Sequence, residues 1–278
     1  LIVDGILLRL EEDRFWYAQA DGDFYSWARA HAAGMDVEIS DPRVYVSQIQ
    51  GPNALKILEA AAGGMPSPFG YFGIARVDLG GQEVVITRTG YTNELGFEFY
   101  TEPHHDADAL WAHLRAAGEP FGLEIFGLDA MNIRRIEAGI LNAGSDFDAA
   151  TTPYDVGLGR FVDEDKGDFI GEAALSAAAS RPSRLHGVAC ADGEPLIGAP
   201  IESGGAVVGR ITAGATSPFL KQGIGYALME TVDLRPGAAV AVGCRDGAMR
   251  EATLVETPFY DKTAEIPRGK KADVPERA

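Results

Sequence analysis

Two acidic side chains stand in apolar surroundings, where they could bind a ligand or handle a proton. Asp4 lies in the segment 1–8, whose other members are aliphatic residues and one glycine. Glu98 lies between two phenylalanines, in an aromatic run typical of a strand. Burial of a carboxylate is costly unless hydrogen-bond donors meet it. Each acid also has a plainer interpretation: Asp4 as part of an Asp-Gly turn, and Glu98 as a solvent-facing acid on an edge strand.

The aromatic run around Glu98 indicates what that acid could bind. Because side chains alternate along a strand, Glu98 and Tyr100 share one face, and Phe97 and Phe99 share the other. A carboxylate on such a face can accept two adjacent N–H donors at once. The 2-aminopyrimidinone ring of a pterin presents such a pair of donors, so a pterin is a candidate ligand.

Alternating strand and helix patterns position these residues in the first two-thirds of the chain. Aromatic and β-branched runs predict strands, and apolar residues at helical spacing between Pro and Gly predict helices. The expected strands are 15–18, 44–49, 84–88 and 97–100, and the expected helices are 23–33, 53–62, 103–117 and 128–138. This part of the chain is therefore α+β, and we expect it to form one domain at 1–178.

The remainder of the chain is almost entirely β-patterned. An Ala/Ser/Arg-rich stretch at 176–183 predicts a helix end and an interdomain connector. Beyond it, short runs between 185 and 255 are separated by Gly- and Pro-containing turns, which is typical of a sandwich or small barrel. We expect a second domain at 179–265 and a loose, polar tail at 266–278.

Composition excludes several classes of partner. The formal net charge of −17 argues against nucleic acid and anionic membrane surfaces, which clustered Lys and Arg would bind. No stretch approaches the ~20 apolar residues of a membrane helix. Cys190 and Cys244 are too few for a disulfide framework and fit a reducing cytoplasm. The first residues lack a signal-peptide pattern and an initiator Met, so we expect an N-terminal segment to be missing.

Motifs of several common catalytic sites are absent. The sequence has no phosphate-binding P-loop, no Gly-x-Gly-x-x-Gly after a strand and no Gly-x-Ser-x-Gly elbow. His104 and His105 are neighbours and therefore point to different faces of a helix, with His113 nearby. We expect these histidines to face solvent, and we expect no metal site.

Five ordered segments resemble the glycine-cleavage T-protein (aminomethyltransferase) family across nearly the whole chain. The segment 90–98 resembles the family's Gly-Tyr-Thr-Gly-Glu-x-Gly-x-Glu motif, with Asn93 in place of the inner glycine. The others are the segment around Asp4, residues 135–139 (Arg-Ile-Glu-Ala-Gly), residues 151–159 (Thr-Thr-Pro-Tyr-Asp-Val-Gly-Leu-Gly) and residues 209–218 (Gly-Arg-Ile-Thr-Ala-Gly, then Ser-Pro).

The resemblance implies a fold, a cofactor and site residues. It implies a folate-binding α+β domain with a ferredoxin-like part, followed by a β-barrel, in a one-carbon transferase that uses tetrahydrofolate. Asp4 matches the family's catalytic aspartate, which steers the proton at N5 of tetrahydrofolate. Glu98 matches the glutamate that binds the pterin, and Tyr91 matches a tyrosine at the folate site. Tyr100 matches a tyrosine near the substrate of a demethylase branch.

One departure separates this chain from true T-proteins. They carry a folate-contacting arginine where this sequence has Met131, and a thioether cannot replace the donors of a guanidinium. Segments 4–10, 14–16, 20–23 and 36–39 resemble the dimethylsulfoniopropionate demethylase branch, in which tetrahydrofolate takes a methyl group from a sulfonium. Aromatic faces such as those of Trp16 and Tyr100 suit that cation, and core packing is the alternative for Trp16.

These features leave four functions open. The sequence favours a demethylase that moves a methyl group from a small-molecule sulfonium, amine or ether donor to N5 of tetrahydrofolate. The first alternative is an aminomethyltransferase of glycine cleavage, whose partner is a lipoyl-bearing carrier protein. The second is the folate domain of a larger flavoenzyme, which residues 257–261 resemble. The third is a non-transferase folate-binding factor for iron–sulfur proteins, whose loop cysteine is missing from the corresponding residues 166–172.

Overall fold

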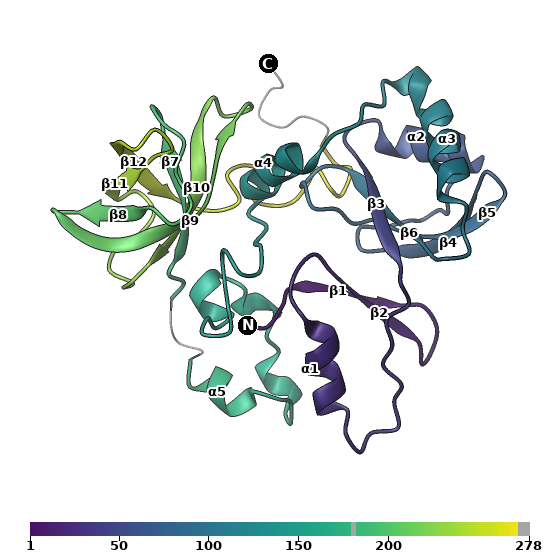
Figure 1. The fold of residues 1–278 in the computed structure, drawn as a ribbon, viewed down its shortest axis with the longest axis horizontal. Helices are drawn as coiled ribbons and strands as arrows, with labels where there is room; N and C mark the ends of the chain where they lie inside the picture. Colours follow the sequence, from purple (N-terminus) through teal and green to yellow (C-terminus); the bar gives the residue numbers. More distant parts are fainter. Residues whose placement is uncertain (179–181, 272–278) are drawn as a thin grey trace.

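The computed structural model describes residues 1–178 and 182–271, and its first domain is built on an antiparallel sheet of order β3-β6-β5-β4 (Figure 1). The strands are β3 (Tyr45–Gln50), β4 (Ile74–Leu79), β5 (Gln82–Thr87) and β6 (Gly96–Thr101). Helices α2 (Ala54–Ala62) and α3 (Ala107–Gly118) contribute apolar side chains to one core together with Phe97 and Phe99. The predicted α+β class is therefore confirmed, and both helices lie on the phenylalanine face.

A two-stranded hairpin contributes to the packing on the other face of the sheet. It pairs β1 (Gly5–Arg9) with β2 (Phe15–Gln19), and α1 (Phe24–His31) follows it. Leu8 of the hairpin forms a small buried cluster with Val85 and Tyr100 of the sheet, and Trp16 packs against that cluster. The alternation predicted for β6 is thus seen directly, with Tyr100 on the hairpin side.

Helix α4 (Leu128–Ala138) lies between the first domain and the barrel (Figure 1). It ends at Gly139, whose φ of +75° lies in the left-handed region that glycine favours. Ile136 is fully buried in a cluster that includes barrel residues, and the Tyr226 hydroxyl donates to the Ile136 carbonyl over 2.9 Å. Helix α4 therefore holds the two domains together through packing and a buried hydrogen bond.

The second domain is a closed barrel, in which the described strands have the order β10-β7-β12-β11-β8-β9. Its strands are β7 (Leu185–Cys190), β8 (Pro200–Ser203), β9 (Ala206–Ser217), β10 (Gln222–Met229), β11 (Ala239–Gly243) and β12 (Met249–Val255). Gly214 and Gly223 sit so close to neighbouring backbone carbonyls that a Cβ at either position would collide with them. The predicted barrel is confirmed, and these contacts explain two of its glycines physically.

An ion cluster lies at the junction of the domains, and the sequence analysis did not anticipate it. Arg134 of α4 pairs with Glu137 and, over 2.7 Å, with Glu94 of the 90–98 loop. Glu137 is fully buried and also accepts hydrogen bonds from Ser217 and Tyr260. We call these five residues the junction cluster; it joins the first domain, the barrel and the C-terminal segment.

The C-terminal segment requires one correction. The loose tail expected at 266–278 is wrong for residues 266–271, because Ile266 is only 2% exposed and its N–H bonds to Asp261. Arg88 of the first domain also donates to the Pro267 carbonyl. The sequence pattern is mostly polar and therefore hides Ile266 and Pro267, which are both buried. Residues 272–278, and residues 179–181 beside the expected domain boundary at 178/179, lie outside the described residues.

Two further differences concern local structure. The histidines expected to face solvent are partly used inside the fold: His105 bonds the Glu102 N–H, and His113 lies 2.7 Å from the Ala61 carbonyl. Strand β4 was not predicted, since its pattern is interrupted by charged residues. Across the described ranges, no helix combines the length and apolar character that crossing a membrane requires.

Candidate active site

Glu98 sits in the middle of β6 with polar neighbours on both sides. It pairs with Gln48 of β3 and with Thr87 of β5. The hydroxyl of Thr89 donates a hydrogen bond to Oε2 of Glu98. Burial raises the pKa of the Glu98 carboxyl, and the hydrogen bonds from Thr89 and Tyr100 oppose that rise. The alternative of a fully solvent-facing acid is therefore wrong for Glu98.

Tyr100 lies next to Glu98 but does not face an open space. Its side chain is 2% exposed, and its ring centre lies 6.0 Å from that of Trp16. Burial raises the pKa of Tyr100 to about 12, so its hydroxyl stays protonated at neutral pH. In this conformation the Tyr100 hydroxyl hydrogen-bonds within the protein, where it favours the charged form of Glu98.

Tyr91 fastens the 90–98 loop to the chain that follows α4. Its hydroxyl donates to the carbonyl of Leu141 over 2.5 Å, and burial raises its pKa to about 12. The loop has a tight path, because a Cβ on Gly90 or Gly96 would collide with the side-chain amide of Gln50. A larger residue at either position would therefore displace the Gln50 amide from its hydrogen bonds to Thr89 and Thr92.

Asn93 stands where the related motif has a glycine, and the backbone explains why the exchange is tolerated. Its φ is +56°, in the left-handed region that glycine favours. Asparagine is among the few other residues that visit this region readily. Its Nδ2 also donates to Asp261 over 3.4 Å, which ties the loop to the C-terminal segment.

Asp4 precedes β1, at the edge of the first domain. Its side chain is exposed, yet loss of hydration next to the protein raises its pKa, while the Gly5 N–H and the charge of Arg160 oppose the rise. Its charge in turn raises the pKa of both Tyr17 and Tyr91. Burial is the main cause of the raised pKa of both tyrosines, and the added effect of Asp4 on Tyr91 places the two residues in one electrostatic neighbourhood. Asp4 therefore lies at the protein surface, with one side exposed to water and the other covered by neighbouring residues.

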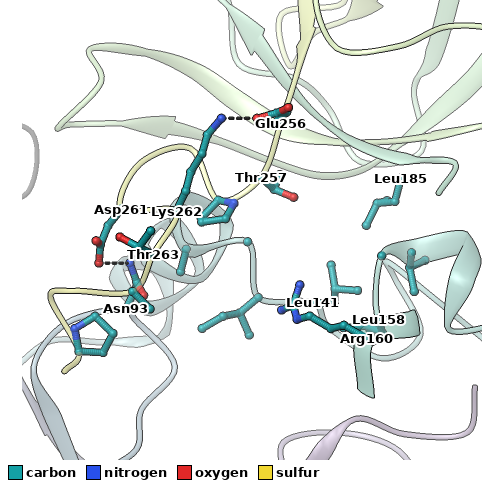
Figure 2. A pocket seen from close by; sticks show the side chains of 18 of the residues that line it. Asn93, Leu141, Leu158, Arg160, Leu185, Glu256, Thr257, Asp261, Lys262 and Thr263 are labelled. Carbon is teal, nitrogen blue, oxygen red and sulfur yellow. Dashed lines mark hydrogen bonds and ion pairs between the residues drawn. The ribbon is translucent and has the colours of Figure 1, made fainter. Parts of the chain in front are cut away.

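A cavity of about 670 Å³ lies where the first domain, the end of α4, the barrel and the C-terminal segment meet. Figure 2 shows Asn93 near Asp261 and Lys262 reaching Glu256 on one side, with Leu141 and Arg160 on the other. Asp4, Tyr91 and Glu98 are not among the residues that line it.

The cavity nevertheless contacts the predicted site residues through their partners. Thr89, which bonds Glu98, lines the cavity, as does Leu141, which accepts the hydrogen bond of Tyr91. Arg160, whose charge acts on Asp4, lines it as well. The sequence analysis did not single out Thr89 or Arg160 as site residues. The position of Thr89, two residues after Thr87 and next to the 90–98 motif, could have indicated its role.

The hydrogen-bonding groups around Glu98 suit a reduced pterin better than a metal ion. Glu98 is a half-buried carboxylate with one oxygen occupied by a hydroxyl donor, which matches a ligand edge rich in N–H groups. Within residues 1–178 and 182–271, no group of three or more His, Cys, Asp or Glu side chains is placed to hold a metal ion.

Comparison with known proteins agrees with this fold. The family described as "GCVT N-terminal domain" matches residues 1–166, and "Glycine cleavage T-protein C-terminal barrel domain" matches residues 184–261. The chain therefore belongs to the glycine cleavage T-protein family, as its sequence motifs predicted. The family's aminomethyltransferases use tetrahydrofolate, and the predicted class of folate-dependent transferase is confirmed.

Individual relatives refine this picture. An aminomethyltransferase of Streptomyces coelicolor is 38% identical, with 94% of this chain and 73% of the relative covered. A dimethylsulfoniopropionate demethylase of Ruegeria pomeroyi is 32% identical, with 92% and 71% covered. The crystal structure of glycine cleavage system aminomethyltransferase T from Bartonella henselae matches with a TM-score of 0.84 and 25% identity, covering 94% of this chain and 73% of that one. Other aminomethyltransferase relatives are covered over as little as 64% of their length.

Proposed function

We propose that this protein is an aminomethyltransferase, which moves a methylene group from a lipoyl-bearing carrier protein to tetrahydrofolate. The observation that supports it best is the graded similarity: 38% identity to an aminomethyltransferase against 32% to a sulfonium demethylase, at nearly equal coverage. This reverses the preference drawn from the sequence motifs, which favoured the demethylase. Those motifs lie in short N-terminal segments, whereas the identity is counted over the whole aligned length.

In this reaction tetrahydrofolate supplies the N5 and N10 nitrogens that receive the methylene carbon, and ammonia and the free carrier thiol leave. The residues of this chain would bind and orient it. Glu98 accepts N–H bonds from the pterin edge, and the Thr89 hydroxyl holds that carboxylate in place. Tyr91 fixes the loop around the ring through Leu141.

Asp4 has the role of proton handling. It lies in the same electrostatic neighbourhood as Tyr91, and its raised pKa brings the carboxyl closer to the range in which it can exchange a proton near neutral pH. We propose that Asp4 holds and steers the proton at N5, so that the N5 lone pair can attack the one-carbon group. The Gly5 N–H and the charge of Arg160 both favour the carboxylate form and oppose the rise in the pKa of Asp4.

A second candidate is a demethylase that uses a small-molecule methyl donor. Met131 favours it, because true T-proteins resemble one another in having an arginine there and this chain does not. The sulfur of Met131, on helix α4, instead accepts a hydrogen bond from Gln48 of β3 over 3.1 Å, so this side chain already has a partner in the protein.

Product analysis separates the two candidates. The purified protein would be incubated with tetrahydrofolate and either an aminomethylated lipoyl carrier protein or a panel of sulfonium, amine and ether methyl donors. We expect 5,10-methylenetetrahydrofolate and ammonia with the carrier. Formation of 5-methyltetrahydrofolate from a small donor, without product from the carrier, would replace this proposal by the demethylase. No folate product under either condition would refute both.

We also propose a cytoplasmic location. Cys190 and Cys244 are free, buried thiols whose sulfurs lie 3.9 Å apart. Free cysteines are usual in the reducing cytoplasm, whereas proteins of oxidising compartments tend to pair theirs in disulfides. Fractionation of cells that express the protein, with thiol labelling of the unfolded chain, tests this location.

A further inference from the structure

Gln48 shares a patch of the sheet with Glu98, and neither the family motifs nor the proposed mechanism uses it. The register of β3 and β6 places Gln48 directly opposite Glu98. Side chains at directly opposed positions point to the same face, with Cβ atoms about 4.5–5.5 Å apart. The next residue, Ile49, belongs to the core under the helices, so Gln48 faces away from them. The amide and the carboxylate therefore stand side by side on the pterin-binding face.

Only one end of the Gln48 side-chain amide has a hydrogen-bond partner. Its Nε2 donates to the sulfur of Met131 over 3.1 Å, while its Oε1 is buried and has no hydrogen-bond partner. Buried polar atoms of native proteins are nearly always paired, so an unpaired acceptor beside a ligand site indicates a donor that arrives with the ligand.

The residue at position 131 decides which end of the amide is free. A thioether sulfur accepts a weak hydrogen bond, so Met131 holds the NH₂ group and leaves the oxygen without a partner. An arginine has five donors and no acceptor, so at this position it would attract the amide oxygen and turn the NH₂ group outward. The change from arginine to Met131 and the free Oε1 of Gln48 are thus one coupled feature.

We propose that Oε1 of Gln48 accepts a hydrogen bond from the 2-amino group of the pterin ring, next to Glu98, and that Met131 positions the amide. The inference rests on the proposed binding of tetrahydrofolate at Glu98. A 2-amino group has two hydrogens, and a carboxylate that also binds the ring N3–H takes only one of them. The second hydrogen points away from the carboxylate, where a neighbouring acceptor is needed. Gln48 is the specificity-determining residue that supplies it.

The test uses two ligands and one pair of variants. Binding of tetrahydrofolate, and of an analogue in which a methyl group replaces the 2-amino group, would be measured by calorimetry under anaerobic conditions. Gln48→Leu removes the acceptor at nearly constant volume, and Ser47→Ala is the matched control, because Ser47 is an exposed residue of the same strand whose side chain points to the other face. We expect Gln48→Leu to weaken tetrahydrofolate binding by about threefold to tenfold and to change analogue binding by less than about twofold.

A second cycle tests the role of Met131. In a Met131→Arg background the guanidinium should occupy Oε1, and Gln48→Leu should then cause no additional loss. If Gln48→Leu lost affinity equally for tetrahydrofolate and for the analogue, the effect would be structural and the inference would be overturned. Unchanged affinity for tetrahydrofolate would overturn it too. Absence of tetrahydrofolate binding by the unsubstituted protein would instead refute the proposed function. If Gln48→Leu does not fold, Gln48→Met provides the same comparison.

Discussion

The hydroxyl of Thr89 donates to the carboxylate of Glu98 and lies 2.5 Å from the hydroxyl of Thr87, which in turn lies 3.5 Å from the hydroxyl of Tyr100. Since Thr89 gives its proton to Glu98, Thr87 is the donor to Thr89. The chain of hydroxyls therefore points toward the carboxylate and stabilises its charged form. It occupies one oxygen of Glu98 and holds the side chain in a fixed orientation for a ligand.

Glu98→Gln should reduce tetrahydrofolate affinity by about tenfold or more, because the new NH₂ group would face a donor of the pterin. Stability should not fall. Burial raises the pKa of Glu98 in the folded protein, so the carboxyl contributes most below its unfolded pKa and loses that contribution as pH rises through the folded value. At neutral pH the ionised carboxyl therefore lowers the free energy of unfolding, and glutamine removes this destabilisation.

Calorimetric titration and thermal unfolding check both parts of this prediction. Glu83→Gln, on the neighbouring strand β5 but exposed, is the matched control and should leave affinity unchanged. Unchanged affinity together with a lower melting temperature for Glu98→Gln would identify Glu98 as a structural acid.

Thr89→Val should shift the pH dependence of folate binding upward. Binding requires the Glu98 carboxylate, and the hydrogen bond from Thr89 lowers a pKa that burial has raised. Without that donor the pKa rises further, so affinity should reach its plateau at a higher pH than in the unsubstituted protein. Titrations at a series of pH values measure the shift. Thr89→Ser keeps the hydroxyl and should restore the original profile; coincident profiles for all three proteins would contradict the role of Thr89.

Asp4→Asn should lower the rate of one-carbon transfer by about 10²–10⁴-fold, the size typical of acid–base groups, while tetrahydrofolate affinity changes little. Because the pKa of Asp4 is raised, the acidic limb of the rate profile should lie above the ordinary aspartate value of 3.8. Asp13→Asn, an exposed acid in the turn of the same hairpin, is the control. A rate equal to that of the unsubstituted protein would remove Asp4 from the mechanism.

Tyr91→Phe should affect stability rather than binding. The hydroxyl donates its hydrogen bond to the Leu141 carbonyl. Removal of the hydroxyl leaves that buried acceptor without this donor. We expect a loss of about 0.5–1.5 kcal/mol in the free energy of unfolding, with tetrahydrofolate affinity within about twofold. Denaturant unfolding and calorimetry measure the two quantities. A large loss of affinity without loss of stability would mean that the hydroxyl serves the ligand directly.

The sequence predicted most of the fold because its signals are local. Helix α4 was predicted at its observed residues, since Gly139 marks its end, and the face of Tyr100 followed from strand alternation. The site was predicted less completely. The orphaned acceptor of Gln48 depends on strand register, and the effect of Arg160 on Asp4 joins segments far apart in the chain. Neither the register nor the proximity leaves a trace in a local pattern.

The buried residue Ile266 also shows that a local sequence pattern can miss a tertiary contact. Most of the surrounding residues are polar, so the local pattern predicted a loose tail, yet Ile266 and Pro267 are buried and the Ile266 N–H bonds to Asp261. The junction cluster is a third case, because its members come from the 90–98 loop, α4, the barrel and the C-terminal segment.

Arg134→Met should be the most destabilising of these substitutions. Arg134 is 13% exposed and contacts Glu94 and Glu137, whose side chains are 8% and 0% exposed. Removal of the guanidinium leaves two carboxylates in a poorly hydrated junction without the cation that both contact, which costs about 3–5 kcal/mol for a buried pair.

Arg76→Met is the matched control for that substitution. Arg76 pairs with Glu83 on the surface, with side chains 44% and 67% exposed, so its loss should cost at most about 1 kcal/mol. Denaturant unfolding followed by fluorescence gives both values, and the slope of each transition reports whether the two domains still unfold together. Because the junction cluster ties the barrel to the first domain, Arg134→Met should split the transition into two steps. A single unshifted transition would show that packing around Ile136 alone couples the domains and that the buried charges contribute little to their union.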